Sequence, residues 1–256
     1  METVMRKSYQ GVFNIIRFNW HFYVIAATFV TTLFAAALVM GESMFWLCIS
    51  LAIGIFASAS ISLLVSYYIY DRSDLYDFNW LQQFNKWETP NIVNIHAGFD
   101  ETSSILKKNF PTATLHVFDF YDPEKHTEIS IERARKAYPP FKGTVKITTR
   151  TLPIATSSAD LTFNIFALHE IRDGNERVEF LKEQVARLEN AGRIVVVEHL
   201  RDTPNFLAYN VGFFHFFSER EWIRNFRNAG LQIETTFKIT AFISVFILKK
   251  LNGNTP

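Results

Sequence analysis

Five of the seven histidines lie at or just beyond the ends of short apolar segments of the kind that form β-strands. In a doubly wound α/β sheet the carboxyl ends of the parallel strands share one edge, and ligands bind along that edge. We therefore expect these imidazoles to converge on one crevice. The five are His96, His126, His169, His199 and His215.

Acidic residues accompany three of these histidines, and the pairing supports two chemistries. In the first, His169 or His199 is a general base, with Glu170 beside His169, because an imidazole of pKa about 6.5 suits proton transfer. In the second, three or four histidines bind a divalent metal with Glu170 or Glu198, since imidazole and carboxylate are common ligands. Hydrogen-bonded structural roles are a third alternative. The metal candidates are His126, His169, His199 and His215.

The segment RDTPNFLAYNVGFFHFFSEREW at 201–222 holds many aromatic residues around a few polar ones. Core packing would explain the aromatic side chains. Apolar walls with a few polar groups are, however, also typical of a ligand pocket. The candidate pocket residues are Asn205, Phe206, Tyr209, Phe213 and His215.

Short β-branched segments alternate with helical patterns after Pro90, which predicts a parallel sheet with crossover helices. The last two strands are only about four residues apart, so they must be antiparallel. We therefore expect a doubly wound, mostly parallel seven-stranded α/β sheet that ends in an antiparallel hairpin. The expected strands are 91–95, 114–118, 144–148, 161–167, 193–198, 231–237 and 242–248, and the expected helices are 101–109, 128–137 and 175–189.

Several features of this region together resemble the class I S-adenosylmethionine-dependent methyltransferases. A glycine-bearing turn follows the first strand, Asp119 closes the second, and a TLP segment follows the third. The string SADLTFNIFALHEIRD forms the fourth strand and its loop, and ARLENAGRIVVVE leads through the fifth. With two apolar segments before it, the string NIHAGFDETS is similar to a group of membrane-anchored bacterial methyltransferases.

The resemblance implies that S-adenosylmethionine lies across the first turn and Asp119, whose carboxylate would accept hydrogen bonds from the ribose hydroxyls. Of the family's glycine-rich loop only Gly98 remains, and a glycine there allows close backbone approach. Asp100 either caps the next helix or meets a positive charge of the cofactor. The implied cofactor-binding residues are Asn94, His96, Gly98, Asp100, Asp119 and Thr151.

Two long segments without Asp, Glu, Lys or Arg precede this domain, at 18–40 and 44–70. Each exceeds the roughly 20 residues that cross a bilayer as a helix, and a signal peptide would be shorter and single. We therefore expect a transmembrane hairpin anchor over 1–70, a connector helix over 71–89 and a methyltransferase domain over 90–250.

Basic residues precede the first span, whereas the loop between the spans carries only Glu42. This asymmetry predicts that both termini and the catalytic domain are cytoplasmic, as in a protein of the bacterial inner membrane. Small residues recur every fourth position in the second span and favour packing of the hairpin on itself or formation of a homodimer. They are Ser50, Gly54, Ser58, Ser62 and Ser66.

Composition excludes other classes of protein. A formal net charge of +1 leaves no broad basic surface for nucleic acid, and the single cysteine excludes a disulfide framework. The sequence thus predicts a membrane-anchored methyltransferase that uses S-adenosyl-L-methionine on an apolar, membrane-resident acceptor of aromatic, pigment, quinone or lipid-like type. The alternatives are a non-catalytic tethered module that has lost the cofactor and a His-bound metal hydrolase on the same sheet.

Overall fold

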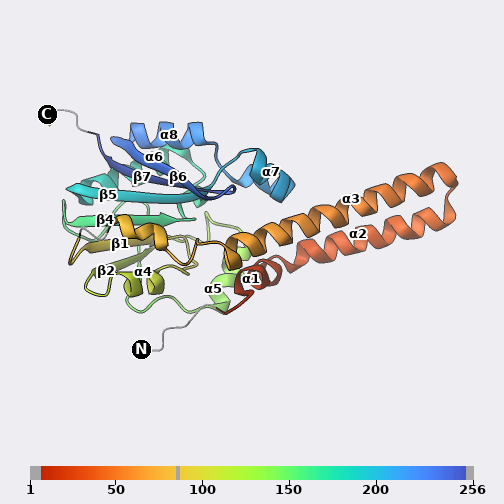
Figure 1. Ribbon diagram of the computed structural model, residues 1–256, viewed down its shortest axis with the longest axis horizontal. Helices are drawn as coiled ribbons and strands as arrows, with labels where there is room; N and C mark the ends of the chain where they lie inside the picture. The colour runs from red at the N-terminus through yellow and green to blue at the C-terminus, as the bar shows by residue number, and fades with distance from the viewer. Residues whose placement is uncertain (1–6, 85–86, 252–256) are drawn as a thin grey trace.

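The computed structural model describes residues 7–84 and 87–251, which form an α/β domain and a helical hairpin that projects from it (Figure 1). The described strands build one sheet in the order β3-β2-β1-β4-β5-β7-β6. Strands β1 to β5 pair in parallel, and β7 is antiparallel to both β5 and β6. The expected doubly wound sheet with its antiparallel end is confirmed. The strands are β1 (Asn91–His96), β2 (Thr114–Asp119), β3 (Val145–Lys146), β4 (Ala159–Ile165), β5 (Leu188–His199), β6 (Leu231–Thr240) and β7 (Ile243–Lys250).

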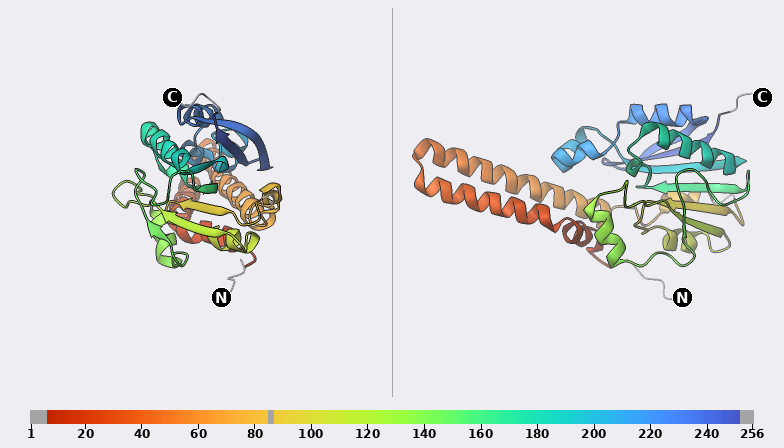
Figure 2. Two further views of the ribbon diagram at one scale, coloured as in Figure 1. Left: turned by 90° about the vertical axis from the view of Figure 1, so that its left-hand side faces the viewer. Right: turned by 180° about the vertical axis from the view of Figure 1, so that it is seen from behind.

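Helices cover both faces of the sheet (Figure 2). Successive residues of a strand point to opposite faces, and the side chains on each face are apolar, so each face is buried under helices. Val93 and Ile95 belong to one core cluster, with Phe180 of α6 and Trp222 of α8. Ile92 belongs to the cluster on the other face. The helices of the domain are α4 (Ser103–Asn109), α5 (Ile129–Ala137), α6 (Gly174–Arg187), α7 (Thr203–Tyr209) and α8 (Glu219–Asn228), with short 3-10 helices η3 (Leu168–Glu170) and η4 (Asn210–His215).

The connector is not the single helix expected over 71–89. A π-helical turn, η1 (Tyr68–Arg72), is followed by turns and the 3-10 helix η2 (Asn79–Phe84). Phe78 adopts a positive φ of 54°, which interrupts a right-handed helix. Apolar side chains of the connector, including Leu75, Phe78 and Leu81, are nevertheless buried against the sheet.

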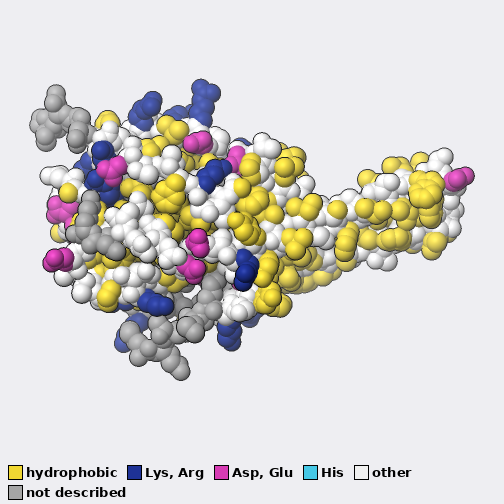
Figure 3. All heavy atoms as spheres, viewed as in Figure 1, with side chains coloured by type: hydrophobic (Ala, Val, Ile, Leu, Met, Phe, Trp, Pro, Cys, Tyr) yellow, Lys and Arg dark blue, Asp and Glu magenta, His cyan; other side chains and the backbone are white. Residues whose placement is uncertain are grey.

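The hairpin consists of α2 (Trp20–Val39) and α3 (Glu42–Tyr67). Both helices are long and apolar enough to cross a membrane, and only 6% and 11% of their most apolar windows are buried. Figure 3 shows hydrophobic side chains over the hairpin, while most charged ones lie on the domain.

A further helix, α1 (Gln10–Phe18), was not expected from the sequence and lies against the base of the hairpin (Figure 1). The carboxylate of Asp71 caps it by accepting hydrogen bonds from the amides of Gly11 and Val12, at 2.7 and 2.8 Å. From α5, Arg133 donates to the carbonyl of Phe18 at 2.6 Å. These contacts attach the hairpin to the domain without a flexible linker.

The small residues of α3 do not all pack within the hairpin. Ser50 and Gly54 are exposed, and a Cβ added at Gly54 would meet no atom within 4 Å. Near the domain, Ser66 is buried, and Ser58 accepts a hydrogen bond from Asn210 at 2.8 Å. The inner part of this stripe therefore joins the hairpin to the domain.

Candidate functional site

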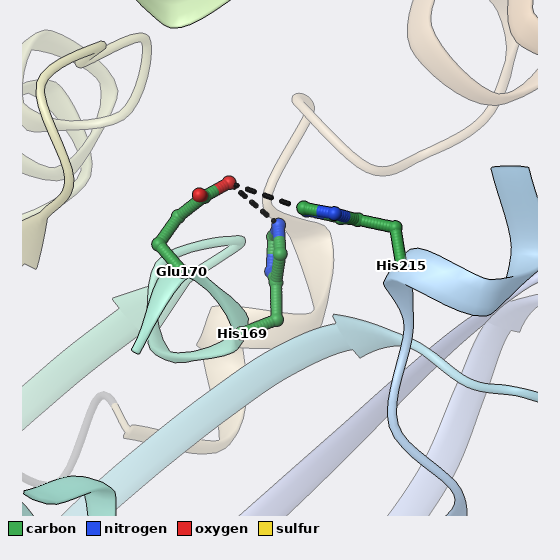
Figure 4. A group of neighbouring side chains, drawn as sticks. All are labelled: His169, Glu170 and His215. Atoms are coloured by element: carbon green, nitrogen blue, oxygen red, sulfur yellow. Dashed lines mark ion pairs between the residues drawn. The ribbon is translucent and has the colours of Figure 1, made fainter. Parts of the chain in front are cut away.

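The carboxyl ends of β4 and β5 bring His169, Glu170, Glu198 and His215 together. Figure 4 shows three of these side chains, His169, Glu170 and His215. The turn η3 follows β4 and presents His169 and Glu170 side by side, while Glu198 lies near the end of β5. Nδ1 of His169 is 2.7 Å from Glu198 Oε2, and its Nε2 is 3.1 Å from Glu170 Oε1. His215, at the end of η4, places its Nε2 3.5 Å from the same Glu170 oxygen.

The two carboxylates determine the charge of His169. Burial alone lowers the pKa of His169, but Glu198 and Glu170 outweigh it and hold that pKa well above the ordinary value. Burial likewise raises the pKa of Glu170, but His169 and His215 bring it well below its usual range. At neutral pH His169 is therefore an imidazolium between two carboxylates. In that state it has no lone pair with which to act as the predicted general base.

His199 occupies a different environment and does not join this group. Its ring stacks on Phe166 and Phe216, with centroids 5.2 and 4.8 Å away. Its Nε2 lies 2.8 Å from Tyr70 Oη, and its Nδ1 lies 3.1 Å from Asn205 Oδ1. Burial lowers the pKa of His199 to about 4. Because both ring nitrogens have partners, the geometry gives His199 a structural role rather than the predicted catalytic one.

A cleft of about 590 Å³ opens beside this group, along α5. His126 lines it, and its Nδ1 accepts a hydrogen bond from the amide of Asp122 at 2.9 Å. His126 is thus outside the His169 group, contrary to the set of metal candidates. Glu128 also lines the cleft and lies 3.8 Å from His215 Nε2, so the cleft adjoins the group.

The first turn, after β1, is held by hydrogen bonds to the start of α4. Asn94 donates to the hydroxyls of Thr102 and Ser103 at 2.9 and 2.8 Å. Oδ1 of Asp100 accepts from the amides of the same two residues, each at 2.9 Å, so its capping role is present. Its other oxygen, Oδ2, is buried and has no hydrogen-bond partner among the described residues.

A second buried polar atom faces the same turn. His96 Nδ1 accepts from the amide of Gly98 at 3.2 Å, and burial lowers the pKa of His96. The neutral ring then carries its proton on Nε2, which is buried and has no acceptor within the part of the chain that the structure describes. The turn therefore offers one unused donor and, at Asp100, one unused acceptor.

The space between Gly98 and Asp119 is taken by Arg135 of α5. Its Nη1 donates to Asp119 Oδ2 and to the carbonyl of Gly98, and its guanidinium lies 4.5 Å from the centroid of Tyr121. Gly98 has φ +98°, and a Cβ there would come within 2.9 Å of Arg135 Nη1. Asp119 is thus at the predicted strand end, but its outer oxygen already has a cationic partner.

Comparisons with known proteins find a shared fold and no close relative. No family model matches the chain, and no curated protein matches its sequence. A pericyclic reaction enzyme is similar over 95% of this chain and 69% of its own, with 14% identity and a TM-score of 0.54. An S-adenosylmethionine-dependent methyltransferase from Methanosarcina mazei is similar over 68% of this chain and 98% of its own, with 16% identity and a TM-score of 0.51. The fold is that of the class I methyltransferases.

A third structure with this methyltransferase fold holds a product of the cofactor. LepI in complex with SAH and a substrate analogue is similar over 95% of this chain and 68% of its own, with 14% identity and a TM-score of 0.54. Within this fold, the first turn and Asp119 lie along the edge where doubly wound sheets bind ligands.

The predicted cofactor residue Thr151 and the predicted pocket residues differ in their burial and in the contacts that they make. Thr151 is exposed and forms a short β-bridge with Thr148. Asn205 is buried and bonds to His199 and Asp202, whereas Phe206 is 47% exposed. Tyr209 is half-buried with its ring against His199, and Phe213 packs on Phe206. Of the five predicted pocket residues, His215 alone joins the His169 group.

Sequence reasoning missed Arg135 and Tyr70 as parts of this edge. Arg135 lies in a helix that was predicted, but its pairing with Asp119 depends on how α5 is placed. Tyr70 lies at the end of the expected second span, whereas the structure bonds it to His199, 129 positions later. Only the basic character of the segment 133–136 could have indicated a cation near Asp119.

Proposed function

We propose that this chain is a membrane-anchored S-adenosylmethionine-dependent methyltransferase with an apolar acceptor that resides in the bilayer. The observation that carries the proposal is the position of the hairpin at the carboxyl edge of a methyltransferase fold. Tyr70, just beyond α3, bonds to His199 at the end of β5, and its ring contacts Phe166 after β4. The edge that binds ligands in this fold thus adjoins the helices that would enter the membrane.

Exposed apolar side chains beside the hairpin support the membrane assignment. Phe206, Leu207, Val211 and Phe214 on α7 and η4 are between 47% and 82% exposed. Asn210 in the same segment bonds to Ser58 of α3, so these side chains lie near the base of the hairpin. An apolar patch continuous with a hydrophobic hairpin suits the lipid interface and an acceptor that leaves the bilayer there.

In this proposal the chain's own residues bind and orient two reactants. His96 and Asp100 would hold the amino acid part of the cofactor, and Asp119 its ribose, once Arg135 withdraws. The cofactor supplies an electrophilic methyl group. Arg135 can move because its side chain is a third exposed and reaches Asp119 from the outer helix α5. Positioning of the acceptor in the cleft beside Glu128 would then be the main contribution of the protein.

Isothermal titration of the full chain in detergent with S-adenosylmethionine tests the proposal. We expect saturable one-to-one binding, and retention of the chain in membranes after alkaline extraction. Absence of binding up to about 1 mM cofactor, the upper end of ordinary enzyme affinities, would contradict it.

The Asp119–Arg135 pair favours a second candidate, a non-catalytic tethered module whose cofactor site is closed by its own arginine. The Arg135→Ala variant separates the two candidates in the same titration. A methyltransferase binds the cofactor in the wild type and more tightly in the variant, whereas a module whose site is closed by Arg135 binds no cofactor in the wild type.

A further inference from the structure

We infer that His169, Glu170 and His215 form a binding site for one divalent transition-metal ion, with Glu198 as the outer residue that orients His169. This inference goes beyond the proposed function, since it concerns a metal that methyl transfer as described above does not require. It rests on the positions of four side chains at the ends of β4, β5 and η4. Figure 4 shows the three inner ones.

The three inner atoms have the mutual spacing of metal ligands. Glu170 Oε1 is 3.1 Å from His169 Nε2 and 3.5 Å from His215 Nε2, and all three lie within 4.8 Å of one another. Ligands bonded at about 2.0 to 2.2 Å around a tetrahedral ion are separated by roughly 3.3 to 3.6 Å. An ion therefore fits among these atoms with only small side-chain shifts.

His215 is the member for which the metal-free arrangement gives no hydrogen bond. Its Nε2 is buried and lacks a hydrogen-bond partner in the described part of the chain. The ring is nevertheless close to the other imidazole, with a centroid distance of 5.1 Å to His169. Two neighbouring imidazoles directed at one carboxylate oxygen are readily explained as ligands of a common cation.

Glu198 has the position of an outer partner in a metal centre. It is completely buried, and its Oε2 lies 2.7 Å from His169 Nδ1. The other carboxylate oxygen accepts a hydrogen bond from the His169 amide at 3.3 Å. Metal-bound histidines commonly donate their second ring nitrogen to such a carboxylate. A metal would therefore replace the Nε2 proton of the His169 imidazolium, while the Nδ1 proton stays in the hydrogen bond to Glu198.

The ligand set indicates the class of metal and leaves a coordination position open. Two imidazoles and one carboxylate suit zinc, iron or another transition ion better than magnesium or calcium, which prefer oxygen ligands. The His215 side chain is 31% exposed, and its Nε2 lies 3.8 Å from Glu128 Oε2, which lines the cleft. A metal held here would thus be accessible from the cleft, where it could bind and acidify a hydroxyl group.

Zinc binding to the full chain tests the inference. The protein is prepared in detergent without a polyhistidine tag, stripped with chelator, incubated with Zn²⁺, desalted and measured by elemental analysis. We expect about one equivalent of zinc in the wild type and less than about a tenth in His215→Ala. His126→Ala is the matched control, since it removes a histidine from the same cleft outside the group, and it should retain the metal.

Glu198→Gln adds a second measurement that does not depend on a lost ligand. It keeps the volume of the side chain and should weaken zinc binding about 10- to 100-fold, the range for outer partners. Less than about a tenth of an equivalent in the wild type, or full zinc retention by His215→Ala, would overturn the inference. Because no cofactor is used, failure of this test is distinct from failure of the S-adenosylmethionine titration.

Discussion

The carboxyl edge of the sheet has an acidic residue at the end of β2 and another near the end of β5, and the two differ in their partners and in their burial. At β2, Asp119 is neutralised by Arg135, a flexible cation from an outer helix. At β5, Glu198 is completely buried and paired with His169, which a second carboxylate also contacts. An exposed guanidinium can be displaced by a ligand at low cost, whereas a buried ion pair cannot be separated without leaving a charge in the interior. At the end of β2 a ligand can therefore take the place of Arg135, and we call this the exchangeable half of the edge. At the end of β5 the ion pair of Glu198 and His169 stays in place, and we call this the permanent half.

The largest expected effect is on stability and comes from breaking the buried ion pair of Glu198 and His169 in the permanent half. Glu198→Ala leaves the His169 imidazolium buried with one carboxylate fewer, and loss of a partner from a buried ion pair costs about 3 to 5 kcal/mol. We expect a lower guanidinium midpoint for the full chain in detergent, followed by near-ultraviolet circular dichroism. Glu189→Ala, on the same strand, is the control, and equal midpoints for the two variants would refute this view of Glu198.

The second prediction concerns His199, which the structure keeps neutral. Its pKa of about 4 in the folded chain lies below the unfolded value of about 6.5, so the unfolded state binds protons first as the pH falls. This contribution is absent above about pH 6.5 and destabilises the fold progressively between pH 6.5 and 4, by about 3 kcal/mol in total. The imidazolium of His169 and the carboxylate of Asp202 act on the same ring in opposite directions.

His199→Gln keeps a polar side chain and removes the titration. The difference in unfolding free energy between wild type and variant should shrink as the pH is lowered from 7 to 4.5. A difference that stays constant over this range would show that His199 does not titrate as a buried neutral group.

The exchangeable half predicts opposite effects of its two partners on cofactor binding. Asp119→Ala should weaken S-adenosylmethionine binding by about 1 to 3 kcal/mol, because the ribose hydroxyls lose a charged acceptor. Arg135→Ala should strengthen it several-fold, by up to about 1 kcal/mol, the usual value of a partly exposed ion pair. Titration calorimetry measures both, with Lys136→Ala as the control on the same helix. A loss of affinity in Arg135→Ala would instead make Arg135 a ligand of the cofactor.

The smallest expected effect lies where the hairpin meets the domain. Ser58→Ala removes the acceptor for Asn210 and should cost about 1 kcal/mol of local stability in α7 and η4. Limited proteolysis within 201–217 should then be faster in the variant than in Ser50→Ala, which changes an exposed serine of the same helix. Identical cleavage rates would mean that this hydrogen bond does not hold the segment.

Much of the fold could be predicted because it depends on local pattern. The strand β1 runs over Asn91–His96 where 91–95 was expected, since its apolar residues and flanking turn are contiguous. The expected strand 144–148 shrinks to the two residues of β3, which lie at the sheet edge and are exposed. Helix α1 was missed because its apolar residues directly precede the expected first span and were not distinguished from it. Contacts with Asp71 and Arg133, which are distant in the sequence, hold the helix in place.

The sequence predicted which residues gather at the site but not which of them bond to one another. That the histidines gather at strand ends follows from the geometry of parallel sheets, and His169, Glu170 and His215 do meet. The same rule gave no means to see that Tyr70 would use one nitrogen of His199, or that Arg135 would reach Asp119. Such partners come from elements whose relative placement depends on the packing of the whole molecule.

In the proposed membrane-anchored arrangement, the continuity of α3 with its π-helical turn would fix the height of the domain above the bilayer. The uninterrupted segment Glu42–Arg72 has 31 residues and is about 46 Å long at 1.5 Å per residue. A hydrocarbon core about 30 Å thick would leave roughly 16 Å, or some ten residues, on the domain side. Since Tyr70, two residues before the end of this segment, is bonded to the sheet edge, that edge would stand about 13 Å from the hydrocarbon core, at the outer limit of the headgroup layer rather than among the acyl chains. An acceptor would then be an amphiphile whose reactive end reaches the headgroup layer while its tail stays in the membrane.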